Sequence, residues 1–276
     1  MKRSLRMIML SVLTAVCFIM AITMTLGVKA AQAENTFRIE EGFSIRTQLP
    51  DGLRVKTLVP NKIEGATYGT LMLPESMCDE IDLAFDENGV LNENVLNIET
   101  QAFNSDGASY NSVLVAEKVD GEEQSFPASF YNVPITVRGY CIDNGVITYT
   151  ENTVTRSMAY VAAVLHVNGL AEGDIFDAII GQCASEIEVA DVIKGEEVTA
   201  KYIIGNIDTS VSDQAVVTFS GDNAEVATVN ADGTIVGLKG GKFNLTATLS
   251  GEGAETITLT KEVTVTEIID VANTYD

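Results

Sequence analysis

Arginine is the residue type in this sequence best suited to bind a ligand. Beyond residue 33 the chain has five arginines, set against 39 acidic residues. A guanidinium group is planar and can bind a carboxylate or a phosphate through two parallel hydrogen bonds. Four of the arginines, together with two tyrosines, are predicted to form a pocket for an anion or an acidic sugar. These candidate ligand-binding residues are Arg46, Arg54, Arg138, Arg156, Tyr68 and Tyr140.

The same arginines have a purely structural interpretation. Because acidic residues are abundant, each arginine can pair with an aspartate or glutamate and tie neighbouring strands together. We expect at least two of the four to be mostly buried and paired with carboxylates. Arg156 is expected in the first turn of a helix, where the helix dipole disfavours a cation, so a nearby carboxylate would be needed to offset that cost.

Other side chains give weaker signals. His166 is the single histidine, which argues against a His-based zinc site, and no cofactor motif is found. Ser157 lies more than two helical turns from His166, too far to act with it as a nucleophile, so we expect a half-buried structural histidine and no catalytic residue. After residue 33 an odd number of cysteines remains, without CxxC spacing, and we expect small buried apolar residues at Cys78, Cys141 and Cys183.

A hydrolase is the alternative from another functional class. Glycoside hydrolysis uses two carboxylates roughly 5–10 Å apart, and with 39 acidic residues such a pair could exist, although no particular pair stands out. Asp86-Glu-Asn-Gly89 slightly resembles a calcium loop but lacks its ligand spacing, so a solvated loop is expected. The chain has no tryptophan, which weakens a role as a carbohydrate-binding platform.

The charge of the chain limits its partners. The formal net charge is −22, and every acidic residue lies beyond residue 33. Such a field repels phosphate backbones and anionic lipids, so we expect no nucleic acid partner and no membrane contact through a basic surface. A wall polymer, a glycan or a surface protein is the expected kind of partner.

The first 33 residues have the pattern of an export signal. Lys2, Arg3 and Arg6 precede an uncharged apolar run, and Ala31-Gln-Ala33 fits the small-residue cleavage rule. We therefore expect residues 1–33 to be removed and the chain to be secreted or held at the cell surface. The apolar run is long enough to cross a bilayer, so an uncleaved membrane anchor is the alternative.

Residues 34–182 are predicted to form a β-rich domain with a helix near 155–167. Apolar and polar residues alternate in 43–48 and in 53–57, on either side of a Pro-Asp-Gly turn, and Asp143-Asn-Gly145 indicates another hairpin. Residues 125–131 are read as one arm of a further hairpin. At 158–165 the apolar period changes from two to 3.6, which indicates a helix, and 170–180 is expected to add a short one.

Residues 184–267 are predicted to form a second β-domain, followed by a tail at 268–276. Apolar residues alternate with polar ones in 243–249 and again in 255–267, which is typical of strands with one buried face. The pattern resets within Gly181–Glu186, so we expect the two domains to fold separately with their boundary there.

The stretch VATVNADGTIVGLKGGKFNLTAT, beginning at Val226, carries a family resemblance. It is similar to the bacterial immunoglobulin-like group 2 module, with the glycines in register. Phe219 stands where the family often has tryptophan, and it can fill the same place in the core. The resemblance implies an immunoglobulin-like β-sandwich that serves as a spacer or adhesive scaffold and has no active site of its own.

Shorter motifs in the first domain carry a second resemblance. SIRTQLPDGLRV, YGTLMLP, ITVRGYCIDNGVITYT and TRSMAYVA resemble a domain found beside immunoglobulin-like repeats in secreted and surface proteins of Gram-positive anaerobes. The similarity covers about residues 37–167 and implies a location rather than an activity. The sequence thus predicts a mainly β, secreted or cell-surface, non-enzymatic protein whose immunoglobulin-like module supports an N-terminal binding domain.

Overall fold

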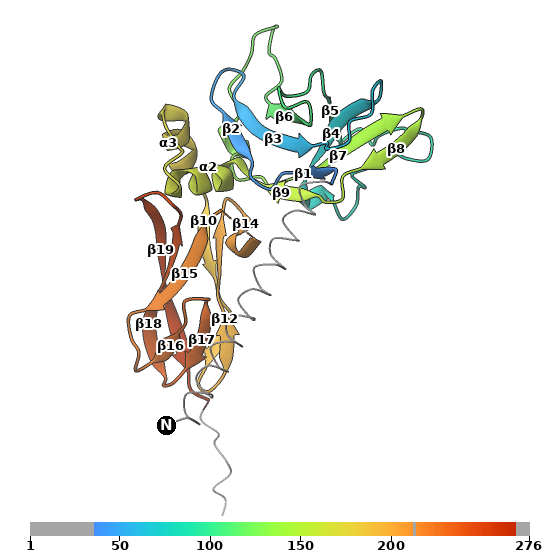
Figure 1. Ribbon diagram of the computed structural model, residues 1–276. Coiled ribbons are helices and arrows are strands. Elements are labelled where there is room, and N and C mark those ends of the chain that lie inside the picture. Colours follow the sequence, from blue (N-terminus) through green and yellow to red (C-terminus); the bar gives the residue numbers. More distant parts are fainter. Residues whose placement is uncertain (1–35, 212–213, 269–276) are drawn as a thin grey trace, which may run out of the picture.

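The computed structural model describes residues 36–211 and 214–268. The predicted export signal, its cleavage site and residues 269–276 lie outside these ranges. The chain is mainly β, as predicted, and its strands form two sandwiches with two helices placed where they meet (Figure 1). None of the helices within the described ranges is long and apolar enough to cross a membrane.

The first half packs two sheets against each other. In one sheet β3 lies between neighbours and pairs antiparallel with three strands; the members are β1 (Arg38–Ile39), β2 (Ser44–Arg46), β3 (Gly52–Leu58) and β6 (Ser109–Val115). The other sheet is built around β7; its members are β4 (Thr67–Pro74), β5 (Leu96–Glu99), β7 (Ile135–Asp143), β8 (Val146–Tyr149) and β9 (Val154–Arg156).

Polar bonds join the facing sides of these sheets inside the core. The Tyr110 hydroxyl donates to the Gly69 carbonyl at 2.6 Å, and the Ser112 hydroxyl donates to the Thr70 hydroxyl at 2.8 Å. The outer side of the β7 sheet is covered by the irregular segment 75–95, which includes the 3₁₀ turn η1 (Glu75–Met77).

The strand predicted at 125–131 is wrong. This segment holds the 3₁₀ turn η2 (Ala128–Phe130), which follows Pro127. Proline has no N–H group to donate to a ladder, so it ends the extended pairing that the alternation suggested.

Helices α2 (Met158–Val167) and α3 (Asp174–Ile180) follow β9. The Ser157 hydroxyl caps α2 by accepting a hydrogen bond from Tyr160 N at 3.2 Å. Arg156 therefore ends β9 and does not stand in the first helical turn, so that expectation is wrong. All of α2 except Leu165 and His166 is buried, which means that the helix is covered on more than one side.

The second half is a sandwich with immunoglobulin-like pairing. One sheet has the order β11 (Val192–Ile193), β19 (Thr256–Thr266), β18 (Gly241–Ser250), β15 (Val216–Gly221). The opposite layer is formed by β12 (Glu197–Thr199), β17 (Thr234–Gly237) and β16 (Ala227–Val229), and by β10 (Ser185–Glu188), β13 (Lys201–Ile204) and β14 (Ile207–Asp208), with the 3₁₀ turn η3 (Thr209–Val211) after them. Phe219 is buried in its core.

Two turns of the second half hold the two ends of α2. The β13–β14 hairpin turns through Gly205 and Asn206, both at positive φ, and Gly205 lies against the start of the helix beside Ser157. At the other end the amide of Gly253 donates to the Val167 carbonyl at 2.8 Å, and Glu252 N donates to the Asn168 side chain at 2.9 Å. We call α2 and these two turns the joint.

Asn132 ties the connection between the halves. Its side chain donates to the Gln182 carbonyl and accepts from Ala184 N, each at 2.8 Å. Its backbone carbonyl accepts from the side-chain amide of Asn206 at 2.8 Å. The buried apolar cluster runs without a break from β3 through α2 into the second half. The two sandwiches therefore share a packed interface around the predicted boundary.

Candidate functional site

Arg46 and Arg54 lie on the outward side of the first sheet. Ile45 and Leu53, which are paired across β2 and β3, point into the core, so their neighbours along each strand point out. Arg46 pairs with Gly52, which makes Arg54 its diagonal neighbour, at a typical separation of roughly 7–8 Å. Lys56 follows on the same side of β3. We call Arg46, Arg54 and Lys56 the arginine face.

The two arginines of this face have no carboxylate partner among the described residues. Arg46 donates one long hydrogen bond, 3.4 Å, to the Leu49 carbonyl. Lys56 differs, because it forms an ion pair of 3.5 Å with Glu40, and both side chains are partly exposed. A partner that carries carboxylates or phosphates would therefore find two guanidinium groups on one side of a rigid sheet.

The other candidate residues in the β7 sheet lie elsewhere and serve packing. The Arg138 guanidinium stacks on the Tyr149 ring at 4.1 Å and lies 3.5 Å from the Leu83 carbonyl. The hydroxyl of Tyr140 donates to the Asn97 side chain at 2.9 Å. Tyr68 is also buried, and burial raises the pKa of both tyrosine hydroxyls. Neither tyrosine can line a surface site beside the arginine face.

Arg156 occupies a third place, at the joint. Its side chain is 8% exposed. One guanidinium nitrogen, Nη1, donates to the Thr155 carbonyl at 2.8 Å, and the group lies 5.5 Å from the centre of the Tyr160 ring. The six candidate residues thus lie in separate places, since Tyr68 is on the side of the β7 sheet opposite to Arg138 and Tyr140, and they do not form the single pocket that the sequence predicts.

The expected pairing of arginines with carboxylates is wrong for the described residues. No ion pair there includes any of the four candidate arginines, and Arg156 alone among them is buried. The physical reason is the strand register. The cross-strand neighbours of these arginines carry no charge; they are Gly52 for Arg46, Ser44 and Val113 for Arg54, Leu71 for Arg138 and Ile135 for Arg156.

Several of the described carboxylates accept hydrogen bonds from nearby backbone N–H groups. Each carboxyl whose pKa shifts within 36–211 and 214–268 has a lowered pKa, and in Asp86, Asp222 and Asp232 the main cause is a backbone N–H bond to the carboxylate. The general acid of a glycosidase needs the opposite shift. His166 contacts Glu255 across the joint at 3.1 Å.

Across the described ranges, no group of three or more His, Cys, Asp or Glu side chains could hold a metal ion. The three cysteines there are free thiols; Cys141 is buried, whereas Cys78 and Cys183 are partly exposed.

Sequence reasoning missed two sets of residues. Lys56 belongs to the arginine face, and the alternation of Arg54 with buried Val55 could have placed it there. The residues of the joint gave a weaker signal. Gly205-Asn206 is a short-turn dipeptide between apolar strands, but nothing in the sequence indicates that the turn contacts a helix 40 or more residues earlier.

No protein-family model matches the chain, and no curated protein matches it. Some solved structures overlap weakly. The mouse nectin-like molecule 4 ectodomain is 10% identical, with 85% of this chain and 67% of that chain covered and a TM-score of 0.27. A C-terminal 282-residue intimin fragment, solved with the intimin-binding domain of its translocated receptor, is 12% identical, with 80% and 63% covered and a TM-score of 0.23.

An Escherichia coli alpha-2-macroglobulin activated by porcine elastase is 10% identical, with 84% of this chain and 22% of that chain covered and a TM-score of 0.25. At such scores these structures support no conclusion about function or about how the two halves are arranged. The immunoglobulin-like class of the second half rests on its own strand pairing.

Proposed function

We propose that this chain is an extracellular, non-enzymatic binding protein that recognises an anionic cell-wall polymer through its arginine face. The second half serves as an immunoglobulin-like support, as the resemblance to the group 2 module implies. The observation that carries the proposal is the placement of Arg46 and Arg54. They share one side of a sheet and have no carboxylate partner among the described residues, in a chain whose net charge is −22.

A cationic site in an acidic protein favours selective recognition over general adhesion. Most of the surface repels a polyanion, so contact is restricted to the place where positive charge is concentrated. Arginine suits this task because its fork fits carboxylate and phosphate groups, whereas lysine acts as a point charge. The joint and Asn132 support the same role, since their hydrogen bonds hold the binding half against the second half.

Co-sedimentation with purified Gram-positive cell walls tests the proposal. The double substitution Arg46→Gln and Arg54→Gln should weaken binding by about tenfold or more, since charge-assisted hydrogen bonds contribute about 1.5–3 kcal/mol each. Added salt should weaken the binding of the unchanged protein as well. The control is Lys239→Gln with Lys242→Gln, which removes the same charge from two exposed side chains of the second half, one just before β18 and one in β18 that is ion-paired with Glu262.

Two results would contradict the proposal. Equal loss of binding in both double variants would show that net charge alone governs adhesion. No binding of the unchanged protein at low salt would remove the anionic wall polymer as the partner.

A further inference from the structure

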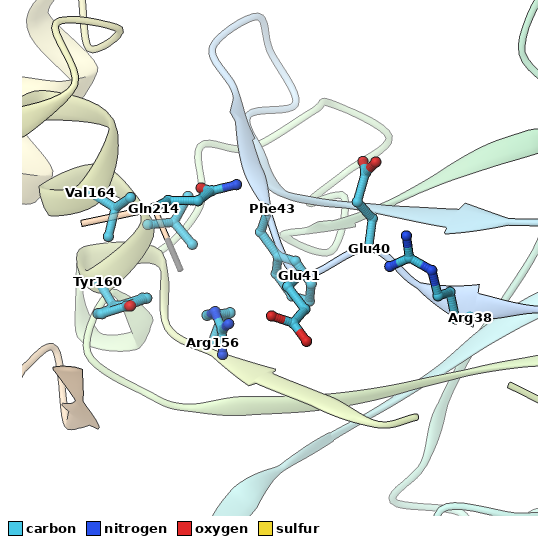
Figure 2. A pocket seen from close by; sticks show the side chains of 10 residues that line it. Arg38, Glu40, Glu41, Phe43, Arg156, Tyr160, Val164 and Gln214 are labelled. Carbon is cyan, nitrogen blue, oxygen red and sulfur yellow. The ribbon is translucent and has the colours of Figure 1, made fainter. Parts of the chain in front are cut away.

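A second place with binding chemistry lies at the joint, away from the arginine face. A cavity of about 340 Å³ opens between the start of the first sheet and helix α2. It has two kinds of wall. Charged side chains of Arg38, Glu40, Glu41 and Arg156 line one part, and apolar side chains that include Phe43 and Val164 line another (Figure 2).

Arg156 is the distinctive group in this cavity. Its side chain is more than nine-tenths buried, yet a single hydrogen bond, to the Thr155 carbonyl, accounts for just one of the five N–H groups of a guanidinium. The Tyr160 ring adds a cation–π contact at 5.5 Å. No carboxylate of the described residues lies within ion-pair distance. Figure 2 shows the guanidinium in the space between the Tyr160 ring and Glu41.

A buried cation without a counter-ion is costly, and an anion bound beside it would offset that cost. The cavity also limits which anion fits. Arg38, Arg156, Glu40 and Glu41 all line it and carry no net charge together, so a singly charged anion fits this lining better than a phosphate or a dicarboxylate. Val161 and Val164, on neighbouring turns of α2, offer an apolar wall for an aliphatic body. The volume is in the range of small-molecule sites.

We propose that this cavity binds a small monocarboxylate with a short aliphatic body. The carboxylate accepts hydrogen bonds from the free N–H groups of Arg156, and the aliphatic part packs against Phe43 and the two valines of α2. A free short-chain acid and the C-terminal leucine of a peptide both carry such a carboxylate with an aliphatic body. The site is independent of the wall-binding function, because it shares no residue with the arginine face.

The test is a calorimetric titration of the mature protein with hexanoate and with hexanamide, which has the same shape and no charge. We expect saturable hexanoate binding that is about tenfold or more tighter than amide binding. Arg156→Gln should remove this preference, whereas Arg54→Gln, on the arginine face, should leave it unchanged. A second titration uses N-acetylleucine and its amide. Tighter binding of hexanoate than of N-acetylleucine identifies a free acid as the ligand, and the reverse order identifies a peptide C-terminus.

Equal affinity for acid and amide, or no binding of either acid, would overturn the proposal, as would a preference for the acid that survives Arg156→Gln. If Arg156→Gln lowers folding, the unchanged protein still decides the question. Methyl NMR signals of Val161 and Val164, assigned with valine-to-isoleucine variants, should then shift with hexanoate and stay in place with hexanamide. Shifts at other methyl groups alone would place the ligand elsewhere and refute the site.

Discussion

The glycine at the tip of the β13–β14 turn should be sensitive to the smallest added side chain. A Cβ atom on Gly205 would lie 2.5 Å from the Ser157 hydroxyl oxygen, 2.8 Å from Tyr160 N and 2.9 Å from the Ala159 Cβ. Two of these atoms belong to the first turn of α2 and cannot move without the helix. Gly205→Ala should therefore strain the joint itself.

A matched control separates this contact from the backbone cost. Gly195 also belongs to the second half and has a positive φ, 85° against 55° for Gly205, but a Cβ there would meet no atom within 4 Å. Gly195→Ala should cost about 1–2 kcal/mol for a left-handed residue. Gly205→Ala carries that cost and adds an overpacking cost of about 1–3 kcal/mol.

Equilibrium unfolding in urea, followed by far-UV circular dichroism, measures both variants. We expect Gly205→Ala to lower the free energy of unfolding by about 1–3 kcal/mol more than Gly195→Ala does. Tyrosine fluorescence should report the same transition if the halves unfold together. Equal losses in the two variants would mean that the turn does not press against α2 in solution, and the described joint would be wrong.

Three further predictions rest on the structure and a fourth on the sequence. Asn132→Ala removes two side-chain hydrogen bonds and should lower the free energy of unfolding by about 1–3 kcal/mol; an unchanged midpoint in urea would contradict this. A fragment of residues 184–268 should unfold cooperatively, but at lower urea than the whole chain because it lacks α2; a non-cooperative melt would refute separate folding. Burial raises the pKa of Tyr110 to about 12, above its ordinary value near 10. The neutral hydroxyl therefore stabilises the folded state below pH 10, and the free energy of unfolding should fall by about 2–3 kcal/mol as the pH rises from 10 to 12. Urea midpoints across this range should fall less steeply in Tyr110→Phe, and an equal slope would contradict the assignment. N-terminal sequencing of the exported protein should begin at Glu34, whereas an intact Met1 would favour the anchor.

Local signals in the sequence predicted the strands and turns well. Asp143-Asn-Gly145 indicated the β7–β8 hairpin, and the structure turns there through Asn144 and Gly145, both at positive φ. The alternation of apolar and polar residues at 243–249 predicted a strand with one buried face, and β18 is such a strand. Such features depend on neighbours a few residues apart, so the sequence contains them directly.

Long-range contacts were predicted poorly. The apolar period at 158–165 indicated one buried stripe, yet Tyr160 and Val164 are buried too, because α2 meets the second half as well as the first. The composition of the helix indicated this second contact, since a helix with apolar residues on every side is usually buried on every side. The pairing of the arginines depended on strand register, and the abundance of acid in the whole chain says nothing about which residue stands opposite Arg54.

The parallel pairing of β11 with β19 has a mechanical consequence. The first half is attached ahead of β11, and the chain leaves β19 at its far end, so tension between the two would pull these strands in opposite directions along their length. Lys194 N bonds the Thr266 carbonyl at 2.9 Å beside an ion pair of Lys194 with Glu267. Force would shear these bonds together rather than open them one by one, so a pull applied between the first half and the end of β19 would meet high resistance.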